Sequence, residues 1–146
     1  MKKILFAAAV LMLSACAGHK ADNTQDSADS VATAVEEVAG AGVADVTDDG
    51  AFRPGMKVDL PTVIDFNATW CGPCRQFKPV FHAAAEKFPG VRFVSIDIDK
   101  NPETAAAFGI TSVPTIIFIK PDGSMTGFSG AVPAEQFDSA IQEFLK

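Results

Sequence analysis

The sequence has few cysteines, few basic residues and no long hydrophobic run. Three cysteines in 146 residues are too few to hold a small protein together by disulfides alone. Twelve basic residues against eighteen acidic ones give a net charge of -6, which disfavours electrostatic binding to nucleic acid or to an anionic lipid surface. We therefore expect no nucleic-acid partner. The hydrophobic content of 48% is nevertheless that of a globular protein with one core.

A short apolar run follows two lysines at the N-terminus. Lys2 and Lys3 precede residues 4–13, which are all apolar. These ten residues are too few for a bilayer-spanning helix, which takes roughly 20. We interpret residues 1–15 as a secretory signal peptide rather than a membrane span.

Cys16 directly follows Leu13-Ser14-Ala15, and this ending resembles the bacterial lipobox. The resemblance implies cleavage before Cys16, acylation of that residue, and attachment to a lipid bilayer. Two or three acyl chains would hold firmly, because each buried methylene contributes about 0.8 kcal/mol. The expected location is the bacterial cell envelope, facing the periplasm, and Ala17 at the second mature position favours the outer membrane. The alternative is an ordinary leader that happens to contain a cysteine.

Residues 16–42 consist mostly of Ala, Asp, Ser, Thr, Glu and Gly. They cannot bury enough apolar surface to offset the entropy of ordering, so we expect a disordered acidic tether behind the lipidated cysteine. From Val43 to Lys146, short apolar runs alternate with segments of helical spacing. This alternation predicts one α/β domain over residues 43–146.

Strands are expected at residues 43–46, 62–66, 91–98, 115–119 and 126–129. The second and fourth of these are almost continuously apolar, which is typical of strands buried on both faces. Residues 120–123 form a turn, and this turn makes the last two strands an antiparallel hairpin. The sheet should therefore be mixed.

Helices are expected to begin at Cys71, Asn101 and Pro133. The first contains Pro79, where we expect a kink. Asn101 precedes a proline and should cap the second helix. The third should place a row of apolar side chains on one face, namely Phe137, Ala140, Ile141, Phe144 and Leu145.

Cys71 and Cys74 lie three residues apart, just after an expected strand. Disulfide exchange needs a thiolate, and the unpaired amides and dipole of a helix N-terminus stabilise one. We therefore assign Cys71 as the attacking thiol. Cys74, nearly one turn further on, can resolve the mixed disulfide. Gly72 and Pro73 keep the ring compact, and Trp70 supplies a flat wall beside it.

Half of a zinc site is the alternative interpretation of a Cys-x-x-Cys pair. Zinc needs four ligands, and the chain offers no second cysteine pair, only His19 in the tether and His82 in a helix. We expect no metal and no organic cofactor, because the dithiol is itself the redox group. His82 is interpreted as a surface residue rather than a catalytic base.

The ten residues from Asp65 to Cys74, Asp-Phe-Asn-Ala-Thr-Trp-Cys-Gly-Pro-Cys, resemble the active-site segment of thioredoxins. Val113-Pro114 before a buried strand and Gly130 near the last helix also match. The resemblance covers residues 43–146 and implies the thioredoxin fold, with a mixed, mostly parallel central sheet flanked by helices on both sides. It also implies a cis peptide before Pro114. The implied substrate groove is bordered by Trp70, Gly72, Pro73, Val113, Pro114 and Gly130. A proline that merely begins a strand is the alternative for Pro114.

Asp65 interrupts an apolar strand, where desolvation should raise its pKa and let it exchange a proton with a buried thiol. In the family the matching residue helps to deprotonate the resolving cysteine, here Cys74. A strand-end aspartate bonded to nearby amides is the alternative. Asn67 and Ser95 stand where thioredoxins commonly have an aromatic residue and often a lysine. Proton transfer should therefore take place in a different environment here.

These features predict an extracytoplasmic thiol–disulfide oxidoreductase, a thioredoxin-like protein disulfide reductase that cycles Cys71 and Cys74. The Gly-Pro pair between the cysteines favours the reducing direction. Its partners would be disulfide-containing envelope proteins as substrates and a membrane or envelope electron donor, and we expect a monomer. The alternatives are an envelope disulfide oxidase or isomerase and a non-catalytic adaptor that uses the groove only to bind peptides.

Overall fold

The computed structural model describes residues 42–146. The predicted signal peptide, the predicted lipidation site Cys16 and residues 17–41 of the predicted tether lie outside this part of the chain. The elements follow one another as β1 (Val43–Asp45), β2 (Thr62–Asn67), α1 (Gly72–Lys87), β3 (Arg92–Asp97), α2 (Pro102–Ala107), β4 (Thr115–Ile119), β5 (Met125–Ser129) and α3 (Ala134–Phe144).

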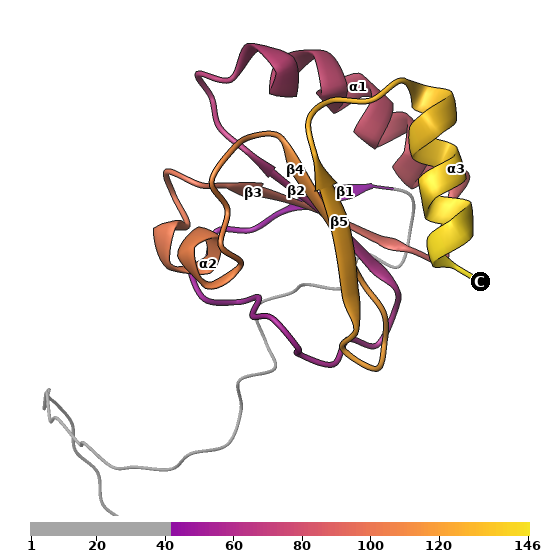
Figure 1. Ribbon diagram of the computed structural model, residues 1–146, viewed down its shortest axis with the longest axis horizontal. Helices are drawn as coiled ribbons and strands as arrows, with labels where there is room; N and C mark the ends of the chain where they lie inside the picture. Colours follow the sequence, from indigo (N-terminus) through magenta and orange to yellow (C-terminus); the bar gives the residue numbers. More distant parts are fainter. Residues whose placement is uncertain (1–41) are drawn as a thin grey trace, which may run out of the picture. The chain divides into compact units, whose positions relative to one another are not determined.

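The five strands form one sheet in the order β1-β3-β2-β4-β5 (Figure 1). β3 pairs in parallel with both β1 and β2, whereas β4 pairs antiparallel with both β2 and β5. β4 therefore runs opposite to the other four strands. The prediction of a mixed, mostly parallel sheet is confirmed, and so is the hairpin between the last two strands.

Helices cover both faces of the sheet, as predicted. Figure 1 shows α1 and α3 together on one side and α2 on the other. The core on the α1 and α3 side is rich in phenylalanine. Phe137 of α3 is fully buried there, and its ring centroid lies 5.0 Å from that of Phe77 and 5.8 Å from that of Phe81. Contacts between these rings pack α1 against α3 and so help to orient α1 on the sheet.

The segment of residues 46–60 contributes to the core on the α2 side. It contains no helix or strand, yet Phe52 is 2% exposed and Val58 is 8% exposed. Both pack with Ile64, Val94 and other strand residues. The sequence analysis assigned this segment no role, because isolated apolar residues without periodicity give no signal.

Asn101 precedes α2 as predicted, but its side chain does not cap the helix. Its amide Nδ2 donates instead to the carbonyl oxygens of Val46 at 3.2 Å and Asp97 at 3.1 Å. Asn101 therefore fastens the start of α2 to the ends of two strands.

Asp49 caps α2 from a distant loop. Its carboxylate accepts hydrogen bonds from the backbone N–H of Glu103 at 2.9 Å and of Thr104 at 2.8 Å. These are amides that no intrahelical carbonyl can pair. The prediction that Asn101 would do this was wrong, because a capping residue more than 50 positions away leaves no local pattern.

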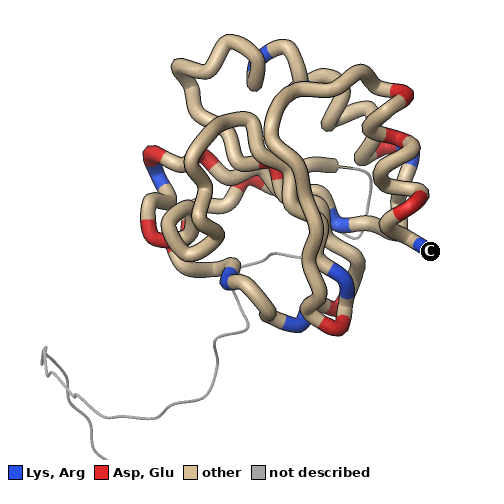
Figure 2. Tube along the Cα trace, viewed as in Figure 1, with Lys and Arg blue, Asp and Glu red and all other residues tan. Residues whose placement is uncertain are grey.

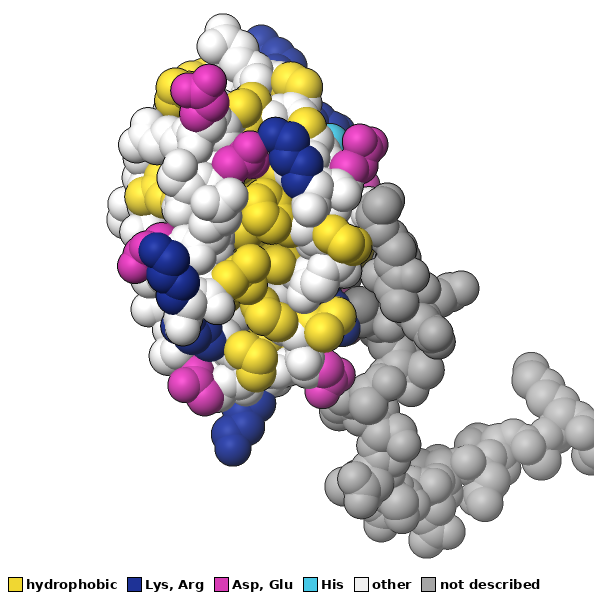
Figure 3. All heavy atoms as spheres, turned by 90° about the vertical axis from the view of Figure 1, so that its right-hand side faces the viewer, with side chains coloured by type: hydrophobic (Ala, Val, Ile, Leu, Met, Phe, Trp, Pro, Cys, Tyr) yellow, Lys and Arg dark blue, Asp and Glu magenta, His cyan; other side chains and the backbone are white. Residues whose placement is uncertain are grey.

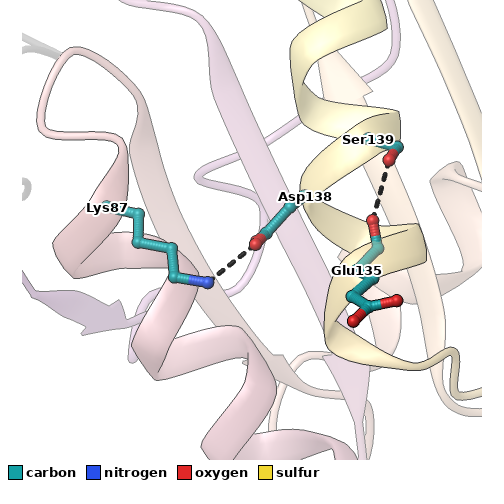
Figure 4. Close-up of polar contacts among 4 residues, drawn as sticks. All are labelled: Lys87, Glu135, Asp138 and Ser139. Atoms are coloured by element: carbon teal, nitrogen blue, oxygen red, sulfur yellow. Dashed lines mark hydrogen bonds and ion pairs between the residues drawn. The ribbon is translucent and has the colours of Figure 1, made fainter.

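The outer surface carries side chains of both charges. Figure 2 shows Lys, Arg, Asp and Glu spread around the fold, and Figure 3 shows hydrophobic side chains between charged ones on the face that carries α3. One ion pair links α1 to α3, with Lys87 Nζ 2.7 Å from Asp138 Oδ2 (Figure 4). It is solvent-exposed and contributes little to stability. Among residues 42–146, no helix is both long and apolar enough to cross a membrane.

Leu145 departs from the predicted apolar face of the last helix. Phe137, Ile141 and Phe144 are buried, but Leu145, which follows the last residue of α3, is 44% exposed. The prediction for Leu145 was therefore wrong. Buried Phe137 and exposed Leu145 therefore make a matched pair for testing where the core lies.

Replacing Phe137 by alanine should lower the free energy of unfolding by about 3–5 kcal/mol, because it removes a ring from the centre of the core. Leu145→Ala should change it by less than about 1 kcal/mol. Urea unfolding followed by circular dichroism measures both. Equal effects of the two substitutions would contradict this account of the core.

Candidate active site

Cys71 and Cys74 are joined by a disulfide, with their Cα atoms 5.3 Å apart. Cys71 is the N-cap of α1, and its Sγ accepts a hydrogen bond from the backbone N–H of Cys74 at 3.1 Å. The two residues are 3% and 5% exposed, so burial does not distinguish them. The helix does, because only the sulfur at the N-cap faces the unpaired amides that stabilise a thiolate.

The chain reaches this position through a short loop after β2. The N–H of Cys71 donates to the carbonyl of Ala68 at 3.1 Å, and Pro73 follows within the first turn of α1. Proline fits there because the amide it lacks would have had no helical partner. Arg75 Nη1 also donates to the carbonyl of Thr69 at 3.2 Å, which fastens the loop to the helix.

Trp70 stands out from the surface beside the disulfide. It is 65% exposed, the most exposed of the large hydrophobic side chains in the described part of the chain. Its Nε1–H donates to Asp99 Oδ2 at 2.9 Å. Trp70 was predicted at the site, whereas Asp99, which belongs to another loop 29 residues later, was not.

Val113, Pro114 and Gly130, which were predicted to border the groove, adjoin the cysteines through Val113. The Val113–Pro114 peptide is cis, and Val113 packs against Cys71 and Cys74. The N–H of Gly130 donates to the carbonyl of Pro114 at 2.7 Å. Gly130 has φ +102°, a conformation that favours glycine. The structure thus places Val113 against the cysteine pair, with Pro114 next to it in the chain and Gly130 hydrogen-bonded to Pro114.

Asp65 is buried in β2, behind the disulfide, with 5% of its surface exposed. Burial raises the pKa of Asp65 to about 7, although a hydrogen bond from Asn67 and the charge of Lys78 oppose the rise. Of its two carboxylate oxygens, Oδ2 lies 3.4 Å from Asn67 Nδ2, whereas Oδ1 is buried and has no hydrogen-bond partner among the described residues. A carboxyl in this state can hold or release a proton near neutral pH.

A pocket of about 250 Å³ is lined by both this carboxyl and Cys74. Its lining includes Asp65 and Cys74 together with Asn67, Ser95, Lys78 and His82. His82 is exposed at the rim, as expected for a surface residue. Within residues 42–146, no three His, Cys, Asp or Glu side chains are grouped so that they could hold a metal ion.

The buried carboxyl of Asp65 should make stability depend on pH. Its pKa lies above the ordinary 3.8, so the folded state holds the proton more tightly than the unfolded state. Ionisation therefore destabilises the fold progressively from about pH 4 to about pH 7. Asp65→Asn should remove this loss, and its stability gain over the parent should grow through that range and level off above pH 7. At about 1.4 kcal/mol per pH unit, the gain has an upper bound on the order of 4 kcal/mol.

Urea unfolding of the disulfide form at several pH values measures this gain. Asp59→Asn is the control, because Asp59 is an exposed carboxyl. A gain for Asp65→Asn that does not change with pH would contradict the raised pKa.

Comparisons with known proteins agree on one family. Residues 43–143 match the thioredoxin family. The chain is similar to a thioredoxin from Porphyra purpurea, with 38% identity over 104 residues that cover 70% of this chain and 97% of the relative. It is also similar to a thioredoxin from Oryctolagus cuniculus, with 42% identity over 87 residues that cover 60% of this chain and 82% of the relative.

Solved structures give the same answer for the fold. Thioredoxin f from spinach chloroplast superposes with a TM-score of 0.65 at 30% identity, covering 75% of this chain and 99% of that one. Thioredoxin from Trypanosoma brucei brucei gives 0.64 at 30% identity, covering 72% and 92%. Because the matched residues include β2, the disulfide and the cis-proline strand, the chain belongs to the thioredoxin family of thiol–disulfide oxidoreductases.

Proposed function

We propose that this protein is an extracytoplasmic protein disulfide reductase in which Cys71 attacks and Cys74 resolves. The observation that carries the proposal is the hydrogen bond from the N–H of Cys74 to Sγ of Cys71 at the first turn of α1. In the reduced protein the same donor would face the thiolate of Cys71 and make it available near neutral pH.

The reaction has two exchange steps. The thiolate of Cys71 attacks a substrate disulfide, and the first substrate sulfur leaves with the bonding electron pair and takes a proton from solvent. Cys74 then gives its thiol proton to the carboxylate of Asp65 and attacks Sγ of Cys71. The second substrate sulfur leaves as a thiolate, and the Cys71–Cys74 disulfide forms. Two electrons pass from the protein to the substrate.

Substrate would bind across the edge formed by Trp70, the Gly72-Pro73 turn, Val113-Pro114 and Gly130. Exposed Trp70 offers a flat apolar surface on one side of the disulfide. On the other side, half-buried Val113 has backbone groups that could pair with an extended substrate segment. Such pairing is independent of side chains, and it suits a reductase that acts on several envelope proteins.

The reducing direction is supported by the Gly-Pro pair between the cysteines. Each cycle leaves the protein oxidised, so a membrane or envelope donor must return two electrons. No metal or organic cofactor is needed, because the cysteine sulfurs carry the electrons themselves.

The location is proposed from the N-terminal sequence. Lys2 and Lys3, the apolar residues 4–13 and the Leu13-Ser14-Ala15-Cys16 ending support a lipoprotein leader. We propose that acyl chains on Cys16 hold the domain at the periplasmic side of a bacterial membrane, with Ala17 favouring the outer membrane.

The two cysteine roles predict different defects. Cys71→Ser should abolish insulin reduction, because it removes the nucleophile. Cys74→Ser should still attack but should accumulate a mixed disulfide with substrate, visible by mass spectrometry and released by dithiothreitol. A trapped adduct on Cys74 of Cys71→Ser, with none on Cys71 of Cys74→Ser, would reverse the assignment.

The lipid anchor predicts a change in precursor size. When the full chain is expressed in a Gram-negative bacterium, globomycin should cause the uncleaved precursor to accumulate, because it blocks the peptidase that cuts before a lipidated cysteine. Cys16→Ser should likewise leave the precursor uncleaved, because it removes the residue that must be lipidated before the cut. A mature form of unchanged size under globomycin would contradict the anchor and leave the proposed chemistry standing.

A further inference from the structure

The side-chain amide of Asn67 lies between the buried carboxyl and the next strand. Its Nδ2 is 3.1 Å from the carbonyl oxygen of Asp65, 3.4 Å from Oδ2 of Asp65 and 3.0 Å from Oγ of Ser95. Ser95 is directly opposite Asp65 in the pairing of β2 with β3. The register of the two strands therefore builds a small polar cluster of Asp65, Asn67 and Ser95.

This cluster makes the two oxygens of Asp65 unequal. Oδ2 is the most distant of the three acceptors that share the two hydrogens of Asn67 Nδ2, but it is the carboxyl oxygen that has a donor. In a protonated carboxyl, the oxygen that accepts a hydrogen bond is the carbonyl oxygen. Oδ1 is buried without a partner among the described residues, so it is the oxygen left to carry the proton. Asp65 also lines the pocket that contains Cys74.

Charged groups surround the cluster on two sides. Arg75, Lys78 and His82 of α1 line the same pocket. Asp45 pairs with Ser95 and Asp97 pairs with Asn67, so these two carboxylates lie on the same sheet face as Asp65. The β4 residue opposite Asp65 is Ile116, which carries no charge. The side chain that hydrogen-bonds to the Asp65 carboxyl is the neutral amide of Asn67, and this amide also bonds to the hydroxyl of Ser95.

We propose that Asn67 and Ser95 are positioning residues that orient the carboxyl of Asp65 so that Oδ1 receives the proton of Cys74. This inference rests on the proposed role of Asp65 in the second exchange step. In that step the S–H bond of Cys74 breaks and an O–H bond forms at Oδ1. The sulfur keeps the electron pair and uses it to attack Sγ of Cys71, and the substrate sulfur leaves with the electron pair of the broken bond. The hydroxyl of Ser95 accepts a hydrogen bond from Nδ2 of Asn67. This bond fixes the orientation of the Asn67 amide relative to the Asp65 carboxyl.

Dithionitrobenzoate separates the two exchange steps of the full-length reduced protein. The first equivalent of thionitrobenzoate reports attack by Cys71, and the second reports resolution by Cys74. Asn67→Ala should slow the second phase about fivefold at pH 7, the effect of one hydrogen bond. It should also move the pH midpoint of that phase upward, because the carboxylate loses a donor that favours its charged form. The first phase should not change.

A double-mutant comparison distinguishes positioning from a structural effect. In the Asp65→Asn background, Asn67→Ala should cause no further slowing of the second phase. Ser95→Ala should slow it in the parent, whereas Ser95→Thr, which keeps the hydroxyl, should restore the rate. Ser139→Ala is the control, because its hydroxyl donates to the Glu135 carbonyl within α3 (Figure 4). Carbon-13 NMR of the Asp65 carboxyl should show its titration midpoint rising in Asn67→Ala, whatever the activity.

Two results would overturn the inference in different ways. Suppose that Asp65→Asn slows the second phase. If Asn67→Ala then leaves this phase unchanged, or slows it by the same factor in the parent and in the Asp65→Asn background, Asn67 does not position the carboxyl. If Asp65→Asn leaves the second phase unchanged, the proton role of Asp65 and this inference both fail. Reduction of disulfides by Cys71 and Cys74 would stand in either case.

Discussion

The hydrogen bond from the backbone of Cys74 to the sulfur of Cys71 is the contact on which the site depends. It exists because α1 begins at Gly72, one residue after the sulfur that it stabilises. The position of that helix start is set by the buried face of α1, where Phe77 and Phe81 pack against Phe137 of α3. A phenylalanine-rich core therefore holds the sulfur of Cys71 at the end of the helix where a thiolate is favoured.

The same packing buries the carboxyl of Asp65, which water would otherwise solvate. Asp65 occupies a position in β2 whose neighbours Ile64 and Phe66 are fully buried. Desolvation of Asp65 destabilises the folded protein when the carboxyl is ionised. It also raises the pKa of this carboxyl to about 7, in the pocket that Cys74 lines too. Burying this carboxyl lowers the stability of the fold, and the same burial gives it the pKa that the proposed proton transfer from Cys74 requires.

Much of this could be predicted from the sequence because the relevant patterns are local. The apolar runs at residues 62–66 and 115–119 became β2 and β4, and Cys71 stands at the start of a helix as expected. Asp65 was noticed because a charge within an apolar strand is conspicuous. These signals need only neighbours in the chain, as strand and helix propensities do.

The features that were missed depend on segments far apart in the sequence. Asp49 caps α2 from another loop, and Asp99 holds Trp70 across 29 residues. Phe52 fills the second core from a segment without periodicity. The Asn67–Ser95 contact could not be predicted without the register of β2 on β3, because strand pairing and not sequence spacing brings the two side chains together.

The most direct test of the central claim is the pH dependence of iodoacetamide alkylation of Cys71 in the reduced protein, with the Cys71 peptide quantified by mass spectrometry. The account predicts a midpoint well below the value of about 8.5 for a free cysteine, and a midpoint at or above it would contradict the claim that the start of α1 stabilises the attacking thiolate.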